Sequence, residues 1–558
     1  MIRKYGKLTW LLVAIVGILT ISPVIMLIFG SFSTGLTATG DFTLEKYIQV
    51  YTDPDFFAVL WNTAQFALGS AMFSVLLALF LAYISVRTDM PFGLFFRILP
   101  IIPMMIPHIL FAISWAMLLN PTNGILNLFF MQIFNLQNAP FNVYSMGGMI
   151  LVEGLLDMPI AYLIIAPAMA SFDGALEESS KVSGAGTIRT LGRITLPVLR
   201  PAILAAFILC IVRALASFAV PSVLGMRGNI SVLATHIYRM ISTGFQPDFG
   251  QAAAAGVSVL AVSVTLIYLY RYFTRSGERF VTVAGRGYKP TLIQLKKAKI
   301  PIFLVLMALV FVLIVLPVLT LLYISLVPYS MVPSARAFSM MDFRHWNHVM
   351  QDPLSLTSLR NSLFLGVVGA SLGVLLSVFV AYIIVKVRTK ASGFLESLSF
   401  LSFSFPGIVI GVGFMWFFVR TPLHATIWAL LIGFIATYLP YGVRPLSSAF
   451  IQIHSHLEES SLVAGASWLT TFRRIILPLL VPGMVSGWVL MAAMFIRELS
   501  LSVVLSRPGS EVLAVQILRF SEDGQWGRLS ALGIIMIAIS TVLVTTVTII
   551  GKKLRPVD

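Results

Sequence analysis

The chain consists of long apolar runs separated by short polar segments. Twelve of these runs are predicted to be membrane-spanning helices, because about 20 apolar residues cross the hydrocarbon as a helix. They lie near 8–30, 58–86, 94–119, 143–170, 200–225, 252–270, 300–327, 358–386, 395–419, 424–450, 483–506 and 528–551. A membrane β-strand needs only about 10 residues, in which polar and apolar positions alternate. The pattern therefore predicts an all-α integral membrane protein.

The polar and small residues between and within these runs repeat along the chain. Asn62-Thr63, Ala82-Tyr83 and Pro107 recur 299 residues later as Asn361-Ser362, Ala381-Tyr382 and Pro406. Pro159, Glu178 and Pro197 recur 281 residues later as Pro440, Glu459 and Pro478. Because each copy holds six predicted spans and runs in the same direction, the repeat is parallel, about an axis along the membrane normal. We expect a first half at 1–273, a basic linker at 274–299 and a second half at 300–558.

The charged residues support this topology. Charged residues make up 11% of the chain, against roughly 25% in soluble domains. Of the 38 Lys and Arg residues, 26 fall in one set of alternate segments, which include both termini, and 8 in the other set. Basic residues favour the cytoplasmic side, so both termini are predicted to be cytoplasmic. The run 8–30 is too long for the core of a cleaved signal peptide and is expected to remain as the first span. This loop bias accounts for the net charge of +16 without a nucleic-acid partner.

One motif occurs twice, after the fourth span of each half. The segment 176–197 begins Leu-Glu-Glu-Ser-Ser-Lys-Val-Ser-Gly-Ala and ends Ile-Thr-Leu-Pro, and 457–478 begins Leu-Glu-Glu-Ser-Ser-Leu-Val-Ala-Gly-Ala and ends Ile-Ile-Leu-Pro. The acidic pairs suit the first turn of a helix, where negative charge complements the helix dipole. Gly184 and Gly465 permit a turn or the close approach of another surface. Each segment is therefore predicted to form a short helix, a turn and a second short helix.

This spacing resembles the EAA loop of ABC importer permeases, which reads Glu-Ala-Ala, three residues, Gly, nine residues and Ile-x-Leu-Pro. The departure is Ser-Ser in place of Ala-Ala, which keeps the side chains small. The resemblance implies a type I importer permease whose two loops dock on two copies of a cytoplasmic ATPase. The residues expected to couple to the ATPase are Glu177, Glu178, Ser179, Ser180, Gly184 and Ala185 in the first loop, and Glu458, Glu459, Ser460, Ser461, Gly465 and Ala466 in the second.

The resemblance also implies the surroundings of the protein. It implies a multi-pass protein of the bacterial inner membrane, surrounded by lipid, and a periplasmic binding protein that delivers a small solute. Among permeases with two fused halves, the linker at 276–290 is most similar to that of the ferric-iron importers, so ferric iron is the expected cargo. Related permeases carry aminoethylphosphonate, sugar phosphates, polyamines or thiamine, and these remain alternatives.

The sequence offers no nucleotide or metal site of its own. No G-x-x-x-x-G-K-[ST] phosphate loop occurs, so ATP and Mg²⁺ are expected on the partner ATPase subunits and not on this chain. No cofactor, catalytic residue or metal site is expected here. Two other function classes remain open: a secondary transporter driven by an ion gradient, and an integral membrane enzyme. The first gives no reason for the paired loops, and the second would need a catalytic cluster within the spans.

Five ionisable residues fall inside or at the ends of the spans: Glu153, Asp157, Arg213, Arg497 and Glu498. Such groups are costly in a membrane and usually face a cavity or a partner. One hypothesis places them along the translocation pathway, and the alternative makes them interhelical pairs or residues that extend toward an interface. Pro100, Pro103, Pro107 and Pro406 further predict irregular backbone at the start of the third and ninth spans.

Overall fold

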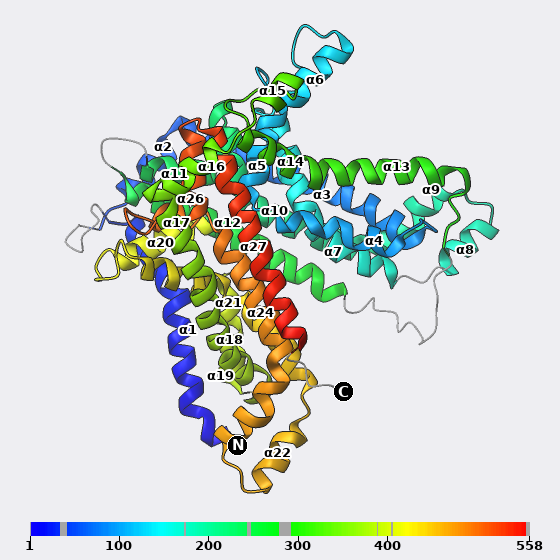
Figure 1. Cartoon of the computed structure of the whole chain (residues 1–558). Coiled ribbons are helices and arrows are strands. Elements are labelled where there is room, and N and C mark those ends of the chain that lie inside the picture. Colours follow the sequence, from blue (N-terminus) through cyan, green and yellow to red (C-terminus); the bar gives the residue numbers. More distant parts are fainter. Residues whose placement is uncertain are drawn as a thin grey trace. The chain divides into compact units, whose positions relative to one another are not determined.

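In the computed structural model the regular structure of the described residues is helical, mostly α with short 3₁₀ and π segments, apart from two isolated bridges between single residues (Figure 1). The structure describes residues 2–33, 42–171, 175–242, 247–277, 292–387, 389–402 and 405–553. Within these ranges, 10 helices are long and apolar enough to cross a membrane. They comprise α1 (Ile2–Ser31), α3 (Pro54–Arg87), α7 (Met146–Ala170), α10 (Leu196–Ala216), α12 (Phe249–Gly277), α13 (Lys299–Val310) continued by α14 (Leu316–Leu326), α17 (Pro353–Phe364) continued by α18 (Ala370–Tyr382), α21 (Ile427–Gln452), α24 (Leu477–Arg497) and α27 (Trp526–Lys553).

The two remaining predicted spans, the third and the ninth, are interrupted helices. In the third, α4 (Gly93–Ile98) leads through the 3₁₀ segment η1 (Leu99–Met105) to α5 (His108–Leu119). In the ninth, α19 (Lys390–Leu401) is followed by α20 (Gly407–Phe418). Pro107 and Pro406 immediately precede the second helix of each pair, where a residue without an N–H costs no helical hydrogen bond. The prolines therefore mark irregular backbone at equivalent places in the two halves, as predicted.

The chain forms two compact units that do not follow the sequence repeat. One unit contains residues 1–52, 237–260 and 343–558, and the other contains 53–236 and 261–342. In the first unit, α1 packs on α19 and α20, where Gly30 lies directly against the ring of Trp416. In the second, α14 packs on α5, and the Ser114 hydroxyl donates to the carbonyl of Pro317 at 3.1 Å. The first span of each half thus packs within the unit built mainly from the other half.

The repeated Asn62-Thr63 and Asn361-Ser362 pairs fix the start of two short helices, α11 (Leu233–Ser242) and α26 (Leu513–Glu522). The hydroxyl oxygen of Thr63 accepts from the backbone N–H of Leu233 at 2.9 Å, and that of Ser362 accepts from Leu513 at 2.8 Å. The Asn361 amide donates to the carbonyl of Glu511 at 2.9 Å. These side chains satisfy backbone groups that the first turn of a helix leaves without a helical partner, which gives the repeat a structural cause.

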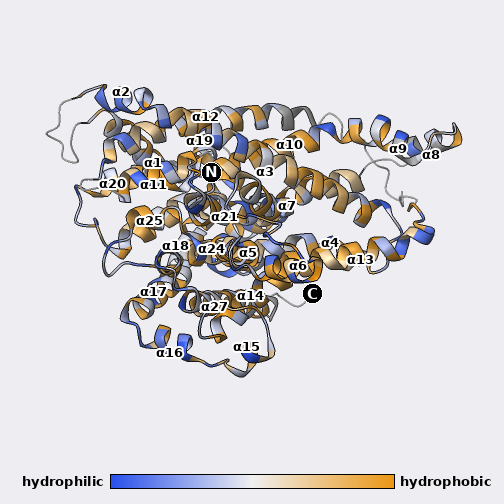
Figure 2. Cartoon of the chain, turned by 90° about the horizontal axis from the view of Figure 1, so that it is seen from above, coloured by the Kyte–Doolittle hydropathy of each residue, from blue (hydrophilic) through white to orange (hydrophobic). Residues whose placement is uncertain are grey.

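Apolar residues cover the long helices, and hydrophilic residues gather on short connecting helices (Figure 2). Figure 2 shows this contrast between α10 or α7 and the hydrophilic α2 (Glu45–Thr52) and α16 (Arg344–Gln351). Large apolar side chains such as Trp10, Leu76 and Ile300 are more than half exposed. Exposed apolar surface along helices of this length is expected where lipid replaces water as the solvent.

Candidate coupling loops and buried charges

Both predicted loops fold as a short helix, a glycine turn and a second short helix. The first contains α8 (Ala175–Val182) and α9 (Thr187–Thr190), and the second contains α22 (Ser455–Val463) and α23 (Trp468–Thr471). Gly184 and Gly465 have φ angles of +81° and +83°, and a Cβ on either would meet no atom within 4 Å. The glycines are therefore required by the left-handed backbone and not by a shortage of space.

The second serine of each loop explains the Ser-Ser departure from the Ala-Ala pattern. The hydroxyls of Ser180 and Thr190 lie 2.9 Å apart, and those of Ser461 and Thr471 lie 2.8 Å apart. Each pair joins the two short helices across the turn. The same serines accept, through their carbonyls, the N–H groups of Ala185 at 3.0 Å and Ala466 at 3.1 Å. This is the hydrogen bond that closes a helix before a left-handed glycine, so both serines stabilise the turn.

The first glutamate of the first loop points into the protein. Glu177 is 5% exposed and forms a salt bridge with Arg87, at the end of α3, which is 1% exposed. The hydroxyl of Thr195 donates to the other carboxylate oxygen of Glu177 at 2.7 Å. Charge-assisted hydrogen bonds of this kind are the stronger ones in proteins. Glu177 therefore attaches α8 to the ends of two spans.

The second loop is attached at the equivalent glutamate by a different set of groups. Glu458 is 7% exposed. It accepts a hydrogen bond from the Tyr382 hydroxyl at 3.3 Å and lies 3.4 Å from the amine of Lys386. Lys386 stands 299 residues after Arg87, so both halves place a cation at the same point. The motif alone does not reveal these partners, although Arg87 and Lys386 fit the same repeat spacing.

The exposed tips of the loops are apolar and small. Val182 and Val463, again 281 residues apart, are both 89% exposed. The Glu459 side chain is 54% exposed and lies 3.2 Å from a ring nitrogen of His456. Ser179, Gly184, Ser460 and Gly465 are also exposed, while Ala185 and Ala466 are partly buried. The side chain of Glu178 lies outside the described part of the chain. Because Glu177 and Glu458 are buried, the surface available to a partner centres on the valines and their small neighbours.

Three of the five ionisable residues of the spans meet between α7 and α10. Arg213 Nε lies 2.7 Å from a carboxylate oxygen of Asp157, which is fully buried. Arg213 also lies 3.4 Å from the Nε2 atom of His108, at the start of α5. Glu153, one turn from Asp157, is 2% exposed and accepts from the Ser217 hydroxyl at 2.8 Å. These contacts are interhelical, as one of the two hypotheses for these residues requires.

The second half also has a buried carboxylate between its fourth and fifth spans, but here the carboxylate lies at the end of the fifth span. Glu498 follows the last residue of α24 and accepts hydrogen bonds from the Tyr438 hydroxyl and, at 2.8 Å, from the N–H of Leu501. Arg497 donates to the sulfur of Met494 at 2.9 Å. By repeat spacing, Ser217 corresponds to Glu498. The carboxylate and the hydroxyl have therefore exchanged helices between the two halves, while the bond between the fourth and fifth spans is retained. A role for these residues in the pathway stays a prediction.

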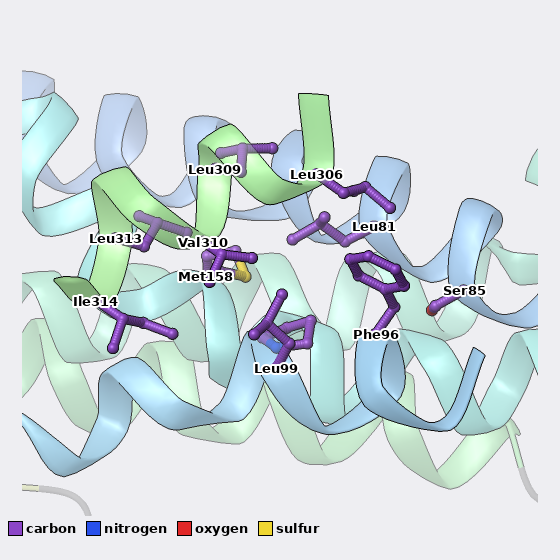
Figure 3. Close-up of a pocket in the computed structure, with 11 residues that line it drawn as sticks. Leu81, Ser85, Phe96, Leu99, Met158, Leu306, Leu309, Val310, Leu313 and Ile314 are labelled. Atoms are coloured by element: carbon purple, nitrogen blue, oxygen red, sulfur yellow. The ribbon is translucent and has the colours of Figure 1, made fainter. Parts of the chain in front are cut away.

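A small, partly open apolar cavity lies between α13, α3, η1 and α7 (Figure 3). Leu306, Leu309 and Leu313 face Phe96, Leu99 and Leu81 across it. Ser85 is the polar residue of the lining, and its hydroxyl is 2.8 Å from that of Tyr162. With this lining the cavity suits hydrocarbon and does not suit an ionic solute.

Comparison with known proteins agrees with the paired loops. The family model of binding-protein-dependent transport system inner membrane components matches residues 74–277 and 373–556, well over half of the chain and once in each half. The chain is 28% identical to the ferric transport system permease protein FbpB of Actinobacillus pleuropneumoniae, over 85% of this chain and 68% of that protein. It is 22% identical to the Fe(3+)-transport system permease protein FbpB 2 of Haemophilus influenzae, over 95% and 96%.

More distant similarities were also found. The spermidine/putrescine transport system permease protein PotC of Escherichia coli is 26% identical over 37% of this chain and 77% of its own length. A crystal structure of a bacterial alginate ABC transporter, in complex with an alginate-bound periplasmic protein, aligns with 49% of this chain and 95% of its own. Its TM-score is 0.41 and its sequence identity 20%.

Proposed function

This chain belongs to the family of binding-protein-dependent transport system inner membrane components, and from that premise we propose that it forms the translocation pathway of an ATP-driven importer. It is an ABC importer permease in which two transmembrane halves are fused into one polypeptide. In the proposal, two copies of a cytoplasmic ATPase bind the two loops, and a periplasmic binding protein delivers the solute. The chain moves the solute without chemical change, and ATP with Mg²⁺ binds to the ATPase subunits.

The observation that carries the proposal is the matched geometry of the two loops. Each presents a valine that is 89% exposed beside a glycine turn, and each is held by a buried glutamate. A single exposed valine is ordinary on a protein surface, but the same residue exposed at the same place in both loops supports a repeated contact with another protein. A secondary transporter driven by an ion gradient would have no use for such a repeated surface. The pair of loops therefore supports one ATPase subunit per half.

Substitution of the two valines tests the docking. Val182→Asp with Val463→Asp places charge on the proposed interface without filling any buried space. We expect the chain to reach the membrane in normal amounts but to lose the ATPase subunits on purification, by at least about tenfold, since a desolvated unpaired charge costs a few kcal/mol. Tyr329→Asp, at an exposed apolar position far from both loops in the sequence, is the control. Unchanged ATPase recovery in the double variant would contradict the proposal.

Ferric iron is the proposed cargo. The proposal rests on the two iron-transport permeases, which align with most of this chain, whereas the polyamine permease aligns with 37% of it. Aminoethylphosphonate, sugar phosphates and thiamine, like polyamines, remain alternatives.

Because binding proteins usually select the solute in this class, the direct test is calorimetry on the cognate binding protein. Ferric iron, phosphonate, sugar phosphate, polyamine and thiamine are compared as ligands. Tight binding of ferric iron alone is the expected result. Selective binding of another ligand would reassign the cargo while leaving the permease assignment in place.

A further inference from the structure

The end of the linker is paired with the residues that follow α3. The N–H of Ile293 donates to the carbonyl of Arg87 at 2.8 Å, and the N–H of Asp89 donates to the carbonyl of Ile293 at 3.1 Å. Together they form a parallel bridge between Thr88 and Ile293, one of two isolated bridges in the described part of the chain. The bridge joins two segments that lie more than 200 residues apart in the sequence.

Asp89 fixes the same segment through its side chain. Its two carboxylate oxygens accept from the N–H of Leu295 at 2.9 Å and from the amine of Lys299 at 3.0 Å. The hydrogen bond from Leu295, followed by that from Lys299, lowers the pKa of the Asp89 carboxyl. Lys299 is the first residue of α13. We call residues 292–299 the strap, because they tie the end of α3 to the beginning of α13.

The strap reaches the residue that holds the first coupling loop. Arg87 contributes its carbonyl to Ile293 and its buried guanidinium to Glu177 of α8. Glu177 of α8 is therefore connected to the strap and to the start of α13 through Arg87 and the two residues that follow it.

We propose that the strap, with Asp89 as its positioning residue, sets the position of the first coupling loop and passes its movement to α13. The inference rests on the proposed function of that loop.

Few side chains of α13 pack inside the protein. Of its residues, only Leu306 is buried, as expected of a span whose surface faces lipid. Leu306 and Leu309 line the small apolar cavity beside the helix (Figure 3). The hydrogen bonds of the strap therefore fix the start of a helix that has few buried contacts of its own.

The second loop is held by other means. The Trp468 indole donates to the Tyr382 hydroxyl at 3.1 Å and stacks on Phe472, with ring centroids 5.1 Å apart. Arg388, 299 residues after Asp89, lies outside the described residues, and no bridge pairs residues 386–387 with another segment in the part that is described. In the described residues, the first loop is thus tied to the start of α13 through the strap, and the second loop is held by aromatic contacts.

Spin labels on the two loops test this difference. Ser179→Cys and Ser460→Cys are matched exposed positions, and the native Cys210 is buried. In the whole chain, reconstituted in lipid nanodiscs, Asp89→Ala or Ile293→Pro should increase the mobile component at position 179 by roughly two- to fivefold. The label at 460 should not change. Asp89→Glu keeps the charge and should restore most of the order.

Asp248→Ala is the matched control. Asp248 also accepts from a lysine, Lys46 at 2.7 Å, and from a backbone N–H, that of Gln251 at 2.9 Å. It should leave both labels unchanged. Equal changes at 179 and 460, or no change at 179, would overturn the inference.

Cross-linking of the same cysteines to the ATPase subunit separates this inference from the proposed function. If the parent chain captures no ATPase at either position, the docking proposal fails, while the mobility result still decides whether the strap positions the loop. If both positions capture ATPase, Asp89→Ala should lower capture at 179 alone.

Discussion

At the scale of single residues, the glycine turns of the coupling loops are the points at which the sequence predicted the structure most directly. The spacing indicated a turn at Gly184 and Gly465, and both have positive φ. In each loop, a hydrogen bond between a serine and a threonine hydroxyl joins the two short helices across the turn. Neither copy of the motif reveals this bond by its sequence.

We predict that Gly184→Ala with Gly465→Ala will weaken coupling without preventing folding. An alanine in this left-handed conformation costs roughly 1–2 kcal/mol, yet its Cβ would meet nothing within 4 Å. Uptake and ATPase capture should fall severalfold while the amount of protein in the membrane stays constant. Gly192→Ala is the control, because Gly192 lies in the same loop with open space and helical backbone. An equal loss in the control would show that the loop tolerates no added methyl group, whatever the φ angle.

The Asp157–Arg213 pair decides between a pathway role and an interhelical bond. Arg213→Ala leaves the fully buried Asp157 without this partner, which should cost about 3 kcal/mol of stability. Arg213→Ala combined with Asp157→Asn removes both charges and should recover most of the thermal stability in detergent. If uptake recovers with it, the pair is structural. If stability recovers while uptake stays low, the residues act in the pathway.

These residues can be identified from the sequence, but their partners cannot. Because burying a charge in a membrane is costly, Asp157 and Arg213 stand out within their apolar spans as residues that need a partner. In the first half the carboxylate lies on the fourth span and bonds to Ser217, and in the second half Glu498, at the end of the fifth span, supplies the carboxylate. This exchange is seen only when the structures of the two halves are compared. Similarly, the motif spacing singles out Glu178, whereas the burial and the salt bridge of Glu177 identify Glu177 as a residue that holds the loop.

At the scale of helices, hydropathy predicted the long spans well because lipid imposes one simple rule of length and apolarity. The third and ninth spans show the limit of that rule. Their apolar runs are long enough, but Pro107 and Pro406 divide them into shorter helices. The prolines were visible in the sequence, whereas the place where each helix resumes depends on local packing.

The short helix α26 offers a test at this scale. Ser362→Ala removes the hydroxyl that accepts from the Leu513 N–H in a buried site. An unsatisfied buried donor costs about 1–3 kcal/mol, so the midpoint of thermal unfolding in detergent should fall by several degrees. Ser397→Ala is the comparison, since Ser397 is exposed and its hydroxyl donates within its own helix to the carbonyl of Gly393. If both variants unfold at the same temperature as the parent chain, the Asn361-Ser362 pair does not stabilise α26.

At the scale of the whole chain, the repeat predicted two halves but not their compact units. Internal similarity reports the order of the spans, and it carries no information about which span packs on which. The structure places α1 with α19 and α20, elements from the other half. A parallel repeat alone does not determine which set of helices the first span of each half packs on. Side-chain fit, such as that of Gly30 on Trp416, determines this packing.

This exchange predicts how the chain will behave when it is divided. Residues 1–285 expressed alone retain α1 but lack α19 and α20, so an apolar helix loses the surface on which it packs. We expect this fragment to aggregate in detergent, and co-expression with 286–558 to restore a single monodisperse complex. The same fragment without residues 1–44 should aggregate less, because the unmatched helix is gone. A stable, monodisperse 1–285 fragment would mean that α1 has a second packing site within its own half and that the observed exchange is not obligatory.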